Sequence, residues 1–249
     1  MLRAVGMTDL GLCRETNQDA FSIQRLHDDT ILAVLCDGMG GENGGNVASE
    51  TAVQMISGQL SRGYRTELGD ISMRALMVSA VSVANAIVRD KARKDPSLSG
   101  MGTTVEVALV REDTAYIAHV GDSSVFFLGK NGMEKLTVDH TRVQQLLDEG
   151  SITPQQASEH PQRHWLTRAV GVENSLVPDF ICCPLDVGEA LLLCSDGLTN
   201  QVEREEICQI LTKALAEDAL HAGAQALVET AKRLGGADNI TVVVISRVS

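Results

Sequence analysis

Four aspartates in this sequence each stand within two residues of a glycine or a serine, at one end of an apolar run. Asp37 directly follows the run 31–36, Asp122 and Asp196 close two further runs, and Asp238 precedes the last one. Uninterrupted apolar runs of this kind predict strands that are buried on both faces. If these strands lie side by side in the fold, the four carboxylates meet at one rim.

Carboxylates that are crowded together repel one another unless a cation lies between them. A ligand set of oxygens, without histidine or cysteine, favours Mg²⁺ or Mn²⁺ over Zn²⁺. The glycines after Asp37 let the backbone bend, so that the carbonyl of Gly38 can point the same way as that carboxylate. Taken alone, each aspartate is more often a turn residue, and Asp238 could merely shape the entry to a strand. The recurrence of the pattern predicts a divalent-metal site.

Seven short motifs follow one another along nearly the whole chain. Together they resemble the metal-dependent protein phosphatases of type 2C, in particular the compact bacterial members. The motifs are Arg14-x-x-Asn-Gln-Asp19, Asp37-Gly-Met-Gly-Gly41, Gly102-Thr-Thr104, Gly121-Asp122-Ser123, Leu166-Thr-Arg-Ala-Val-Gly171, Ser195-Asp-Gly197 and Gly236-x-Asp238-Asn-Ile-Thr241.

The resemblance implies a binuclear Mn²⁺ or Mg²⁺ centre, with two catalytic ions, at one rim of the fold. By position in the motifs, Asp37 would bridge both ions and Gly38 would contribute its carbonyl to one of them. Asp196 and Asp238 would hold the other ion. All of the groups named here are also among the strand-end groups that the recurring pattern predicts.

The remaining site residues are also implied by the resemblance. Asp19 would support the ions through water, and Asp122 together with Asp196 would form a third metal site. Arg14 would grip the substrate phosphate, which suits a guanidinium facing paired oxygens. A water between the two catalytic ions would attack phosphorus in line, without a covalent phosphoenzyme, with Asp37 and Arg14 as the catalytic residues.

Two positions depart from the family pattern. Met39 stands where many members carry histidine, and because methionine cannot donate a proton, the group that protonates the leaving oxygen stays open. Ser124 replaces the arginine that usually follows Gly-Asp-Ser, which removes a cation near the third metal site. Cys36 adjoins Asp37, but a buried run without a neighbouring base does not activate a thiol, so we discount it as a nucleophile.

The elements that must position these residues do not alternate strictly between strand and helix, which argues against a parallel sheet. Two antiparallel sheets with helices on the outside fit the order better, and the resemblance implies a four-layer α-β-β-α sandwich of the α+β class. The stretch from 103 to 138, with its Asn131-Gly132 turn signal, is predicted to form an antiparallel meander. Predicted strands are 2–8, 19–25, the run ending at 37, 103–110, 114–120, 124–129, 134–138, 178–183, 190–195 and 240–245; predicted helices are 46–61, 71–93, 141–149, 154–159, 203–216 and 218–234.

The region from about 141 to 175 matches the variable flap of the family. It contains four side chains that could meet an acidic phosphopeptide, although loop residues of this kind are as often plain surface. They are His160, Arg163, His164 and Arg168.

Composition sets limits on the class of protein. The chain has 249 residues, of which 44% are hydrophobic and 22% charged, as in ordinary globular proteins, and we expect one domain over residues 1–249. Its formal charge of −12, with no cluster of lysine and arginine, argues against a nucleic-acid partner. No signal peptide and no run long enough to span a bilayer is expected, so no membrane partner and a cytoplasmic location are predicted. The six cysteines show no Cys-x-x-Cys spacing and are expected to be reduced.

The function that the resemblance implies is a protein phosphatase acting on phosphoserine and phosphothreonine. Its partners would be phosphorylated proteins, among them a bacterial serine/threonine kinase, and the chain is expected to be a monomer. Two alternatives stay open: a metal-dependent hydrolase of small phosphoesters, and an inactive member that only binds phosphopeptides. The complete set of expected metal ligands argues against the second.

Overall fold

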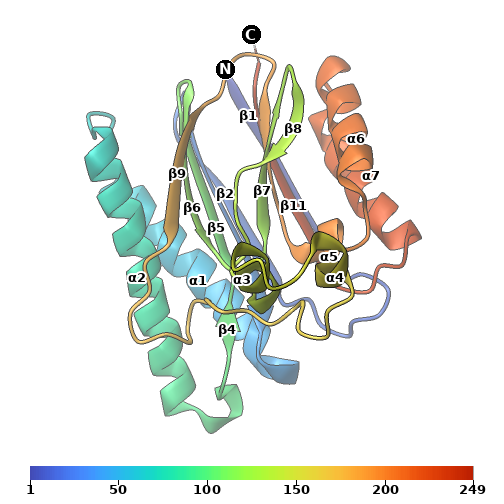
Figure 1. Cartoon of the computed structure of the whole chain (residues 1–249). Helices are drawn as coiled ribbons and strands as arrows, with labels where there is room; N and C mark the ends of the chain where they lie inside the picture. Colours follow the sequence, from blue (N-terminus) through green and yellow to red (C-terminus); the bar gives the residue numbers. More distant parts are fainter. Residues whose placement is uncertain (249) are drawn as a thin grey trace.

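The computed structural model describes residues 1–248, except for the side chains of residues 41–43. Two antiparallel sheets pack face to face in the middle of the molecule (Figure 1). Sheet A has the strand order β1-β11-β10-β7-β8, and sheet B has the order β2-β3-β5-β6-β9, with β4 paired to β3. The strands are β1 (Leu2–Asp9), β2 (Asp19–His27), β3 (Thr30–Met39), β4 (Gly102–Thr103), β5 (Val105–Arg111), β6 (Thr114–Val120), β7 (Ser124–Gly129), β8 (Gly132–Lys135), β9 (Asp179–Pro184), β10 (Ala190–Cys194) and β11 (Ile240–Arg247).

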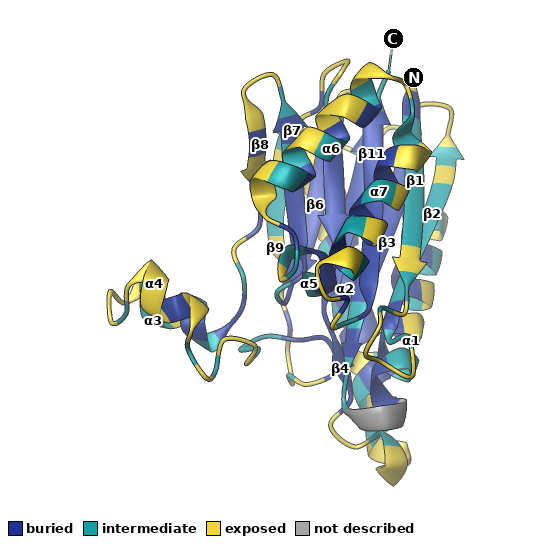
Figure 2. Cartoon of the chain, turned by 90° about the vertical axis from the view of Figure 1, so that its right-hand side faces the viewer, coloured by how far each residue is buried: buried dark blue, intermediate teal, exposed yellow. Residues whose placement is uncertain are grey.

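Two pairs of long helices cover the outer faces of the sheets. Helices α1 and α2 lie on sheet B, and α6 and α7 lie on sheet A, where Figure 2 shows their outward sides exposed (Figures 1 and 2). The α-β-β-α sandwich expected from the sequence is thereby confirmed. The helices are α1 (Gly41–Gly63), α2 (Asp70–Lys94), η1 (Pro96–Leu98), α3 (Arg142–Asp148), α4 (Pro154–Ser158), α5 (Asp196–Thr199), α6 (Arg204–Ala216) and α7 (Leu220–Arg233).

Strand β3 explains why the sandwich has three apolar cores. Its residues 31–36 are at most 2% exposed. Leu35 packs in the core between the two sheets, whereas Val34 and Cys36 pack in the core beneath α1 and α2. A third core lies beneath α6 and α7. The prediction of one domain over residues 1–249 stays a prediction, and the core that the two sheets share favours it.

The predicted meander over 103–138 is wrong. Strands β5 and β6 pair with each other in sheet B, but β7 and β8 belong to sheet A, so the chain crosses between the sheets after Val120. Gly121 makes this crossing with φ of +113°, a conformation that favours glycine. Strands that are buried on both faces carry no alternation of polar and apolar residues, and the sequence therefore does not tell which sheet each one joins.

Helix α2 differs from the expectation that no run could span a bilayer. By length and composition alone it qualifies, with a mean hydropathy of 1.7 over an 18-residue window. In the fold, however, its buried side packs against the apolar core under sheet B, where Met77, Val81 and Val88 are fully buried. The apolar composition of α2 is explained by this packing.

Two smaller differences concern the ends of elements. The β7–β8 hairpin has its loop at Lys130–Asn131, and β8 ends at Lys135 rather than continuing to 138. The short helix α5, which begins at Asp196, was not expected.

Region 141–175 projects from one end of the sandwich (Figure 2). An isolated bridge between Thr103 and Val170 ties the region to the sandwich, and a second bridge, between Thr141 and Leu166, lies within the region.

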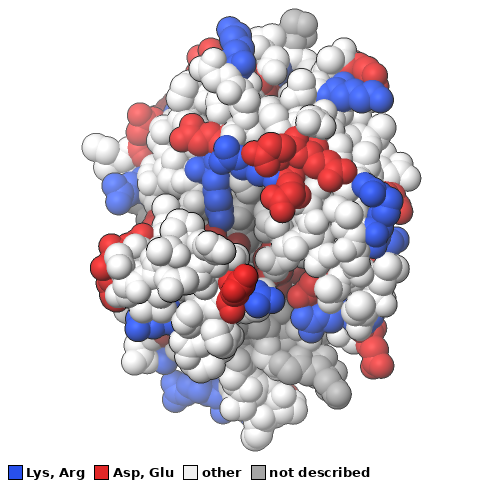
Figure 3. Space-filling model, turned by 45° about the vertical axis from the view of Figure 1, so that its right-hand side comes forward, with Lys and Arg blue, Asp and Glu red and all other residues white. Residues whose placement is uncertain are grey.

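Charged side chains are interspersed on the molecular face shown in Figure 3, where lysines and arginines lie among acidic and neutral residues. On this face, the described part of the chain forms no continuous basic stripe. This face is in keeping with the net charge of −12, and the absence of a nucleic-acid partner stays a prediction.

Candidate metal centre

The antiparallel sheets bring five aspartates to one rim of the sandwich. Asp19 opens β2 and lies directly opposite Asp37 near the end of β3, as partners in the strand register. Asp122 follows β6, Asp196 follows β10, and Asp238 lies two residues before β11. Because neighbouring strands run in opposite directions, the end of one strand and the start of the next meet at the same edge. The convergence expected from the sequence is what the topology produces.

A cavity of about 540 Å³ opens at this rim. Asp37, Asp122, Asp196 and Asp238 line it together with Arg14, whereas Asp19 is not among the lining residues and is only 8% exposed. Other lining residues are Cys13, Glu15, Thr16, Gln18, Gly38, Met39, Gly40, Thr104, His164, Leu166 and Asn239. Six of the seven predicted site residues therefore line a single cavity.

Burial and mutual repulsion shift the acidity of the rim carboxylates. Burial is the main cause that raises the pKa of Asp37 well above its usual value, and the charges of Asp19, Asp196 and Asp122 raise it further. The pKa of Asp19 rises to about 6 and that of Asp122 to about 7, in both cases mainly through burial. Burial, and then the charge of Asp238, also raise the pKa of Asp196. Such a group of acids is stable as carboxylates only when cations offset their charge.

One carboxylate oxygen of Asp19 accepts no hydrogen bond from the described residues. Its Oδ2 accepts a hydrogen bond of 2.8 Å from Ser195 Oγ, but its buried Oδ1 has no hydrogen-bond partner among the described residues. Buried polar atoms are nearly always paired with protein or water. A water held at the rim by a divalent ion would supply this donor, so the position of Asp19 fits the supporting role that the resemblance implies.

The backbone at Gly38 leaves no room for a side chain. A Cβ at this position would overlap the carbonyl oxygen of Gly45 and lie 2.6 Å from the carbonyl oxygen of Gln18. The amide of Gly38 donates to that same Gln18 oxygen at 3.1 Å. Glycine is needed here because two other backbone segments approach closely, a reason that differs from the bend of the backbone expected from the sequence.

Two hydroxyl residues from other motifs hold Asp37 in place. The Asp37 amide donates to Thr104 Oγ1 at 2.9 Å, and the Thr104 amide donates back to the Asp37 carbonyl at 2.9 Å. Thr104 Oγ1 also shares a hydrogen bond of 2.8 Å with Ser123 Oγ, next to Asp122. These hydroxyls were recognised only as members of motifs, because a threonine after a glycine carries no signal of which carboxylate it will support.

Asn239 organises the segment that carries Arg14. Its Oδ1 accepts from the Gln18 amide at 2.8 Å, and its Nδ2 donates to the carbonyls of Leu10 and Thr16 at 3.0 and 3.1 Å. The segment between β1 and β2 is thereby tied to the start of β11. The asparagine that follows Asp238 is thus a positioning group whose role the sequence alone did not reveal.

Arg14 contacts Asp238 in this structure. Its Nη2 donates to Asp238 Oδ2 at 2.8 Å, and the two side chains are 54% and 35% exposed. Among the described residues, no three histidine, cysteine, aspartate or glutamate side chains already form a converged ligand set. Coordination of an ion by several rim carboxylates therefore requires some side-chain rotation, and Arg14 supplies part of the positive charge at the rim.

Helix α5 places Asp196 beside the other acids. Ser195 Oγ accepts from the Thr241 amide at 2.9 Å, which ties β10 to β11 immediately before Asp196. Asn200 Nδ2 donates to Asp196 Oδ2 at 3.0 Å. A side chain at Gly197 would overlap the carbonyl of Asn239, so the Ser-Asp-Gly motif encodes a tight contact between the two strands.

The flap residues divide into two groups. His164 lines the main cavity, and with Arg163 it also lines an adjoining cavity of about 260 Å³ that reaches Asp122 and Asp196. His160 instead accepts a hydrogen bond of 3.1 Å from the Gln162 amide, and Arg168 donates to Asp179 at 2.8 Å. The structure brings only His164 and Arg163 to the rim.

The three positions that raised questions in the sequence have distinct surroundings. Met39 lines the cavity, so no proton donor stands at that position. Ser124 is buried, and its Oγ has no hydrogen-bond partner among the described residues. Cys36 is fully buried and burial raises the pKa of its thiol, which leaves it unsuited to nucleophilic attack. All six cysteines of the chain are free.

Comparison with known proteins places this rim in a family. The sequence profile described as Protein phosphatase 2C matches residues 14–232. The serine/threonine phosphatase stp of Listeria innocua is 34% identical over 240 residues, which cover 96% of this chain and 94% of that protein. The serine/threonine phosphatase of S. agalactiae superposes with a TM-score of 0.91 at 32% identity, covering 99% of this chain and 100% of that chain.

A further solved structure carries metal. The catalytic domain of the serine/threonine protein phosphatase PstP in complex with two manganese ions has a TM-score of 0.85 and 32% identity, and the match covers 100% of this chain and 99% of that one. The relatives and structures match over nearly the whole chain, and the profile covers every rim aspartate except Asp238. The chain belongs to the protein phosphatase 2C family of metal-dependent serine/threonine phosphatases.

Proposed function

We infer that this protein removes phosphate from phosphoserine and phosphothreonine in proteins, using divalent metal ions held at the rim. The observation that carries the inference is the group of half-buried carboxylates with raised pKa values, Asp37, Asp122 and Asp196, which line one cavity beside Arg14. Only cations make such a cavity stable at neutral pH, and a cation-filled cavity attracts a phosphate dianion.

We assign the metal ligands by their place in the cavity. Asp37 and the Gly38 carbonyl lie at the end of β3, and Asp196 and Asp238 lie across the rim at the ends of β10 and β11. These groups would hold two ions of Mn²⁺ or Mg²⁺, since all of them offer oxygen. When bound, the ions would activate the attacking water and withdraw charge from the phosphoryl oxygens. A third ion would be held by Asp122 with Asp196, which also line the adjoining cavity.

Arg14 is placed to bind the substrate phosphate. Its guanidinium is 54% exposed and lines the cavity, so it can exchange Asp238 for two phosphate oxygens when substrate arrives. Asp19 would orient water beneath the site through its free Oδ1. The attack on phosphorus is expected to be in line, because positioning and electrostatic stabilisation are the main contributions that a protein makes to phosphoryl transfer.

The cellular setting is also a proposal. The free state of all six cysteines favours a reducing compartment, and we place the protein in the cytoplasm. Its substrates would be phosphorylated proteins, among them a serine/threonine kinase that it opposes. A monomer is proposed because the rim draws all of its expected ligands from one chain.

The test compares phosphate release from a panel of phosphoserine and phosphothreonine peptides with release from p-nitrophenyl phosphate, in chelator and with Mn²⁺ or Mg²⁺ added. The expected result is metal-dependent turnover with a higher kcat/KM for the peptides, which Asp196→Asn abolishes. A higher kcat/KM for the small ester would favour a small-phosphoester hydrolase. Metal-dependent peptide binding without turnover would indicate a binding module.

A further inference from the structure

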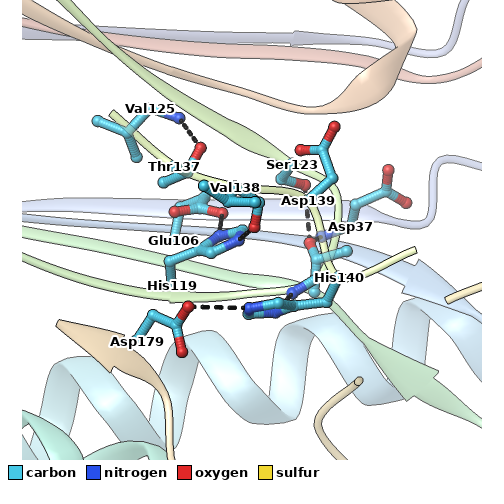
Figure 4. Close-up of polar contacts among 12 residues, drawn as sticks. Asp37, Glu106, His119, Ser123, Val125, Thr137, Val138, Asp139, His140 and Asp179 are labelled. Atoms are coloured by element: carbon cyan, nitrogen blue, oxygen red, sulfur yellow. Dashed lines mark hydrogen bonds and ion pairs between the residues drawn. The ribbon is translucent and has the colours of Figure 1, made fainter. Parts of the chain in front are cut away.

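Two histidines lie behind the metal rim and take no part in the proposed chemistry. The rings of His119 and His140 stack with their centroids 4.5 Å apart, and their residues are 0% and 8% exposed. Figure 4 shows the pair lying between Glu106 and Asp179. A pair of imidazoles buried this deeply needs a partner for each ring nitrogen.

His140 is bound to the turn that precedes Asp122. Its amide donates to the Gly121 carbonyl at 2.7 Å, and the Gly121 amide donates to His140 Nδ1 at 3.0 Å. Gly121 is the residue with φ of +113° at which the chain crosses from sheet B to sheet A. Both polar groups of its backbone are thus held by a single residue. The carboxylate of Asp122 is attached to the next position along the chain.

The second ring nitrogen of His140, Nε2, also has a hydrogen-bond partner. Because Nδ1 accepts a hydrogen bond from a backbone amide, the proton of the neutral ring must be on Nε2, which donates to Asp179 Oδ2 at 3.1 Å. Arg168 Nη1 lies 2.8 Å from the same Nε2 and donates to the other oxygen of Asp179 at 2.8 Å. Since a guanidinium can only donate, its contact with the protonated Nε2 is not a hydrogen bond, and Arg168 acts here by fixing the Asp179 carboxylate. Burial, followed by the neighbouring His119, lowers the pKa of His140 to about 4, so the ring stays neutral at neutral pH.

His119 holds the segment on which His140 stands. Its Nε2 donates to the Val138 carbonyl at 2.9 Å, and its Nδ1 is hydrogen-bonded to Oε1 of the fully buried Glu106. The Thr167 amide donates to the His140 carbonyl at 2.8 Å, so region 141–175 is anchored to the same segment. Residues 138–140 are therefore held by β5 and β6 through Glu106 and His119, by β9 through Asp179, and by region 141–175.

We propose that His140 is a positioning residue for Asp122, and that its Nδ1 lone pair holds the Gly121 turn in the geometry that the third metal site needs. The proposal rests on the proposed function, because Asp122 matters as a ligand only if the rim binds metal. A histidine that only filled space would act through its size, and either of two similar amides could replace it. A positioning histidine acts through one nitrogen, so the two replacements must differ.

The experiment compares His140→Asn with His140→Gln. The asparagine Oδ1 can take the place of Nδ1 and accept from Gly121, whereas the glutamine amide reaches the place of Nε2 and leaves the Gly121 amide without its acceptor. Calorimetric titration of Mn²⁺ into the metal-free full-length proteins gives the affinity of each class of site. Groups that orient metal ligands typically change affinity by about 10- to 100-fold when they are removed.

We expect His140→Gln to weaken the weakest Mn²⁺ site by about 10-fold or more, and His140→Asn to stay within about threefold of wild type. Turnover by His140→Gln should need correspondingly more Mn²⁺, with little change in KM for the phosphopeptide at saturating metal. The exposed His27, which ends β2 far from the rim, provides the control variant His27→Gln, which should match wild type. Equal Mn²⁺ affinities in the two His140 variants would overturn the proposal.

A second measurement does not depend on the variants being folded or on metal binding. Imidazole ¹⁵N spectra of the metal-free wild-type protein report which ring nitrogen carries the proton. We expect His140 to be neutral with its proton on Nε2 at pH 7, and a proton on Nδ1 would overturn the proposal. If wild-type protein bound no Mn²⁺ and released no phosphate, the proposed function would fail, while this spectrum would still decide whether His140 holds the Gly121 turn.

Discussion

Two groups of acids in this fold deal differently with the same electrostatic problem. At the rim, the charges of Asp122 and Asp196 raise the pKa of Asp37, and the charge of Asp196 also raises that of Asp122. Behind the rim, Glu106 is more deeply buried, at 0% exposed, and it is hydrogen-bonded to His119. Burial raises the pKa of Glu106 to about 7, and the charge of His119 opposes that rise.

The comparison shows which acids need a cation that the chain itself does not supply. Glu106 and His119 form a pair that shares a proton and carries no net charge, so it needs no added cation. The carboxylates of Asp37 and Asp196 have no such partner of equal depth, since Arg14 is half exposed and paired with Asp238. Loss of metal should therefore alter the rim and leave the Glu106–His119 pair unchanged.

The largest effect on stability is expected when His119, the hydrogen-bond partner of Glu106, is removed. His119→Leu would leave Glu106 buried without its hydrogen-bond donor, and breaking a buried pair in this way costs about 3–5 kcal/mol. Denaturant unfolding in chelator measures this loss. The exposed His27 again offers a control, because His27→Leu should change stability by no more than about 0.5 kcal/mol. Equal stability of His119→Leu and wild type would contradict the claim that His119 stabilises the buried Glu106.

A second prediction concerns the pH dependence of the metal-free protein. The folded-state pKa values of Asp19, about 6, and of Asp122, about 7, lie above the value of about 3.9 for an unfolded aspartate. Between these values the folded state binds more protons, so stability is highest near pH 4 and is lost as the pH rises towards 7. Between pH 5 and 8 the two groups together should lose on the order of 4 kcal/mol of stability, measured by unfolding in chelator.

Saturating Mn²⁺ should reverse this pH trend, because carboxylates must lose their protons to bind metal. Stability in Mn²⁺ is expected to rise between pH 5 and 7. If the stability of the metal-free protein also rose between pH 5 and 7, the pKa values of the rim acids would not be raised by burial and repulsion.

Much of the rim could be predicted from the sequence, for a physical reason. An apolar run followed by Asp-Gly or Asp-Ser records both the burial of a strand and the polar group at its end, and this is how Asp37, Asp122 and Asp196 were found. Antiparallel pairing then brings such ends together, whichever sheet each strand joins. The wrong prediction of a single meander over 103–138 therefore did not affect the prediction that the aspartates meet at one rim.

The supporting groups could not be predicted in the same way. Whether Thr104 supports Asp37, or His140 holds Gly121, depends on contacts between segments that are far apart in the sequence. The pairing of Arg14 with Asp238, 224 residues away, is of the same kind. A histidine beside a glycine-rich turn gives no sign of which nitrogen will be used until the fold places its neighbours.

The smallest effect on stability is expected at the exposed cation of the rim. Arg14→Ala removes a pair that is largely solvated and should change stability by no more than about 1 kcal/mol. Because the guanidinium is proposed to bind phosphate in both ground and transition states, KM for phosphopeptides should rise by about 10-fold with little change in kcat. Steady-state kinetics at saturating Mn²⁺ measures both. Unchanged kinetics would remove Arg14 from the phosphate site.

The central claim is that the rim carboxylates are held together by divalent ions, and Asp37→Asn tests it most directly because the charges of Asp19, Asp196 and Asp122 all act on Asp37. The measurement is thermal melting of wild type and variant, each in chelator and in Mn²⁺. Mn²⁺ at about 100 times its Kd should add about 2.7 kcal/mol per site to wild type, or roughly 5–10 °C. In chelator, Asp37→Asn should melt no lower than wild type, since one repelling charge is gone, and it should gain much less from Mn²⁺. An equal gain in the two proteins would contradict the account.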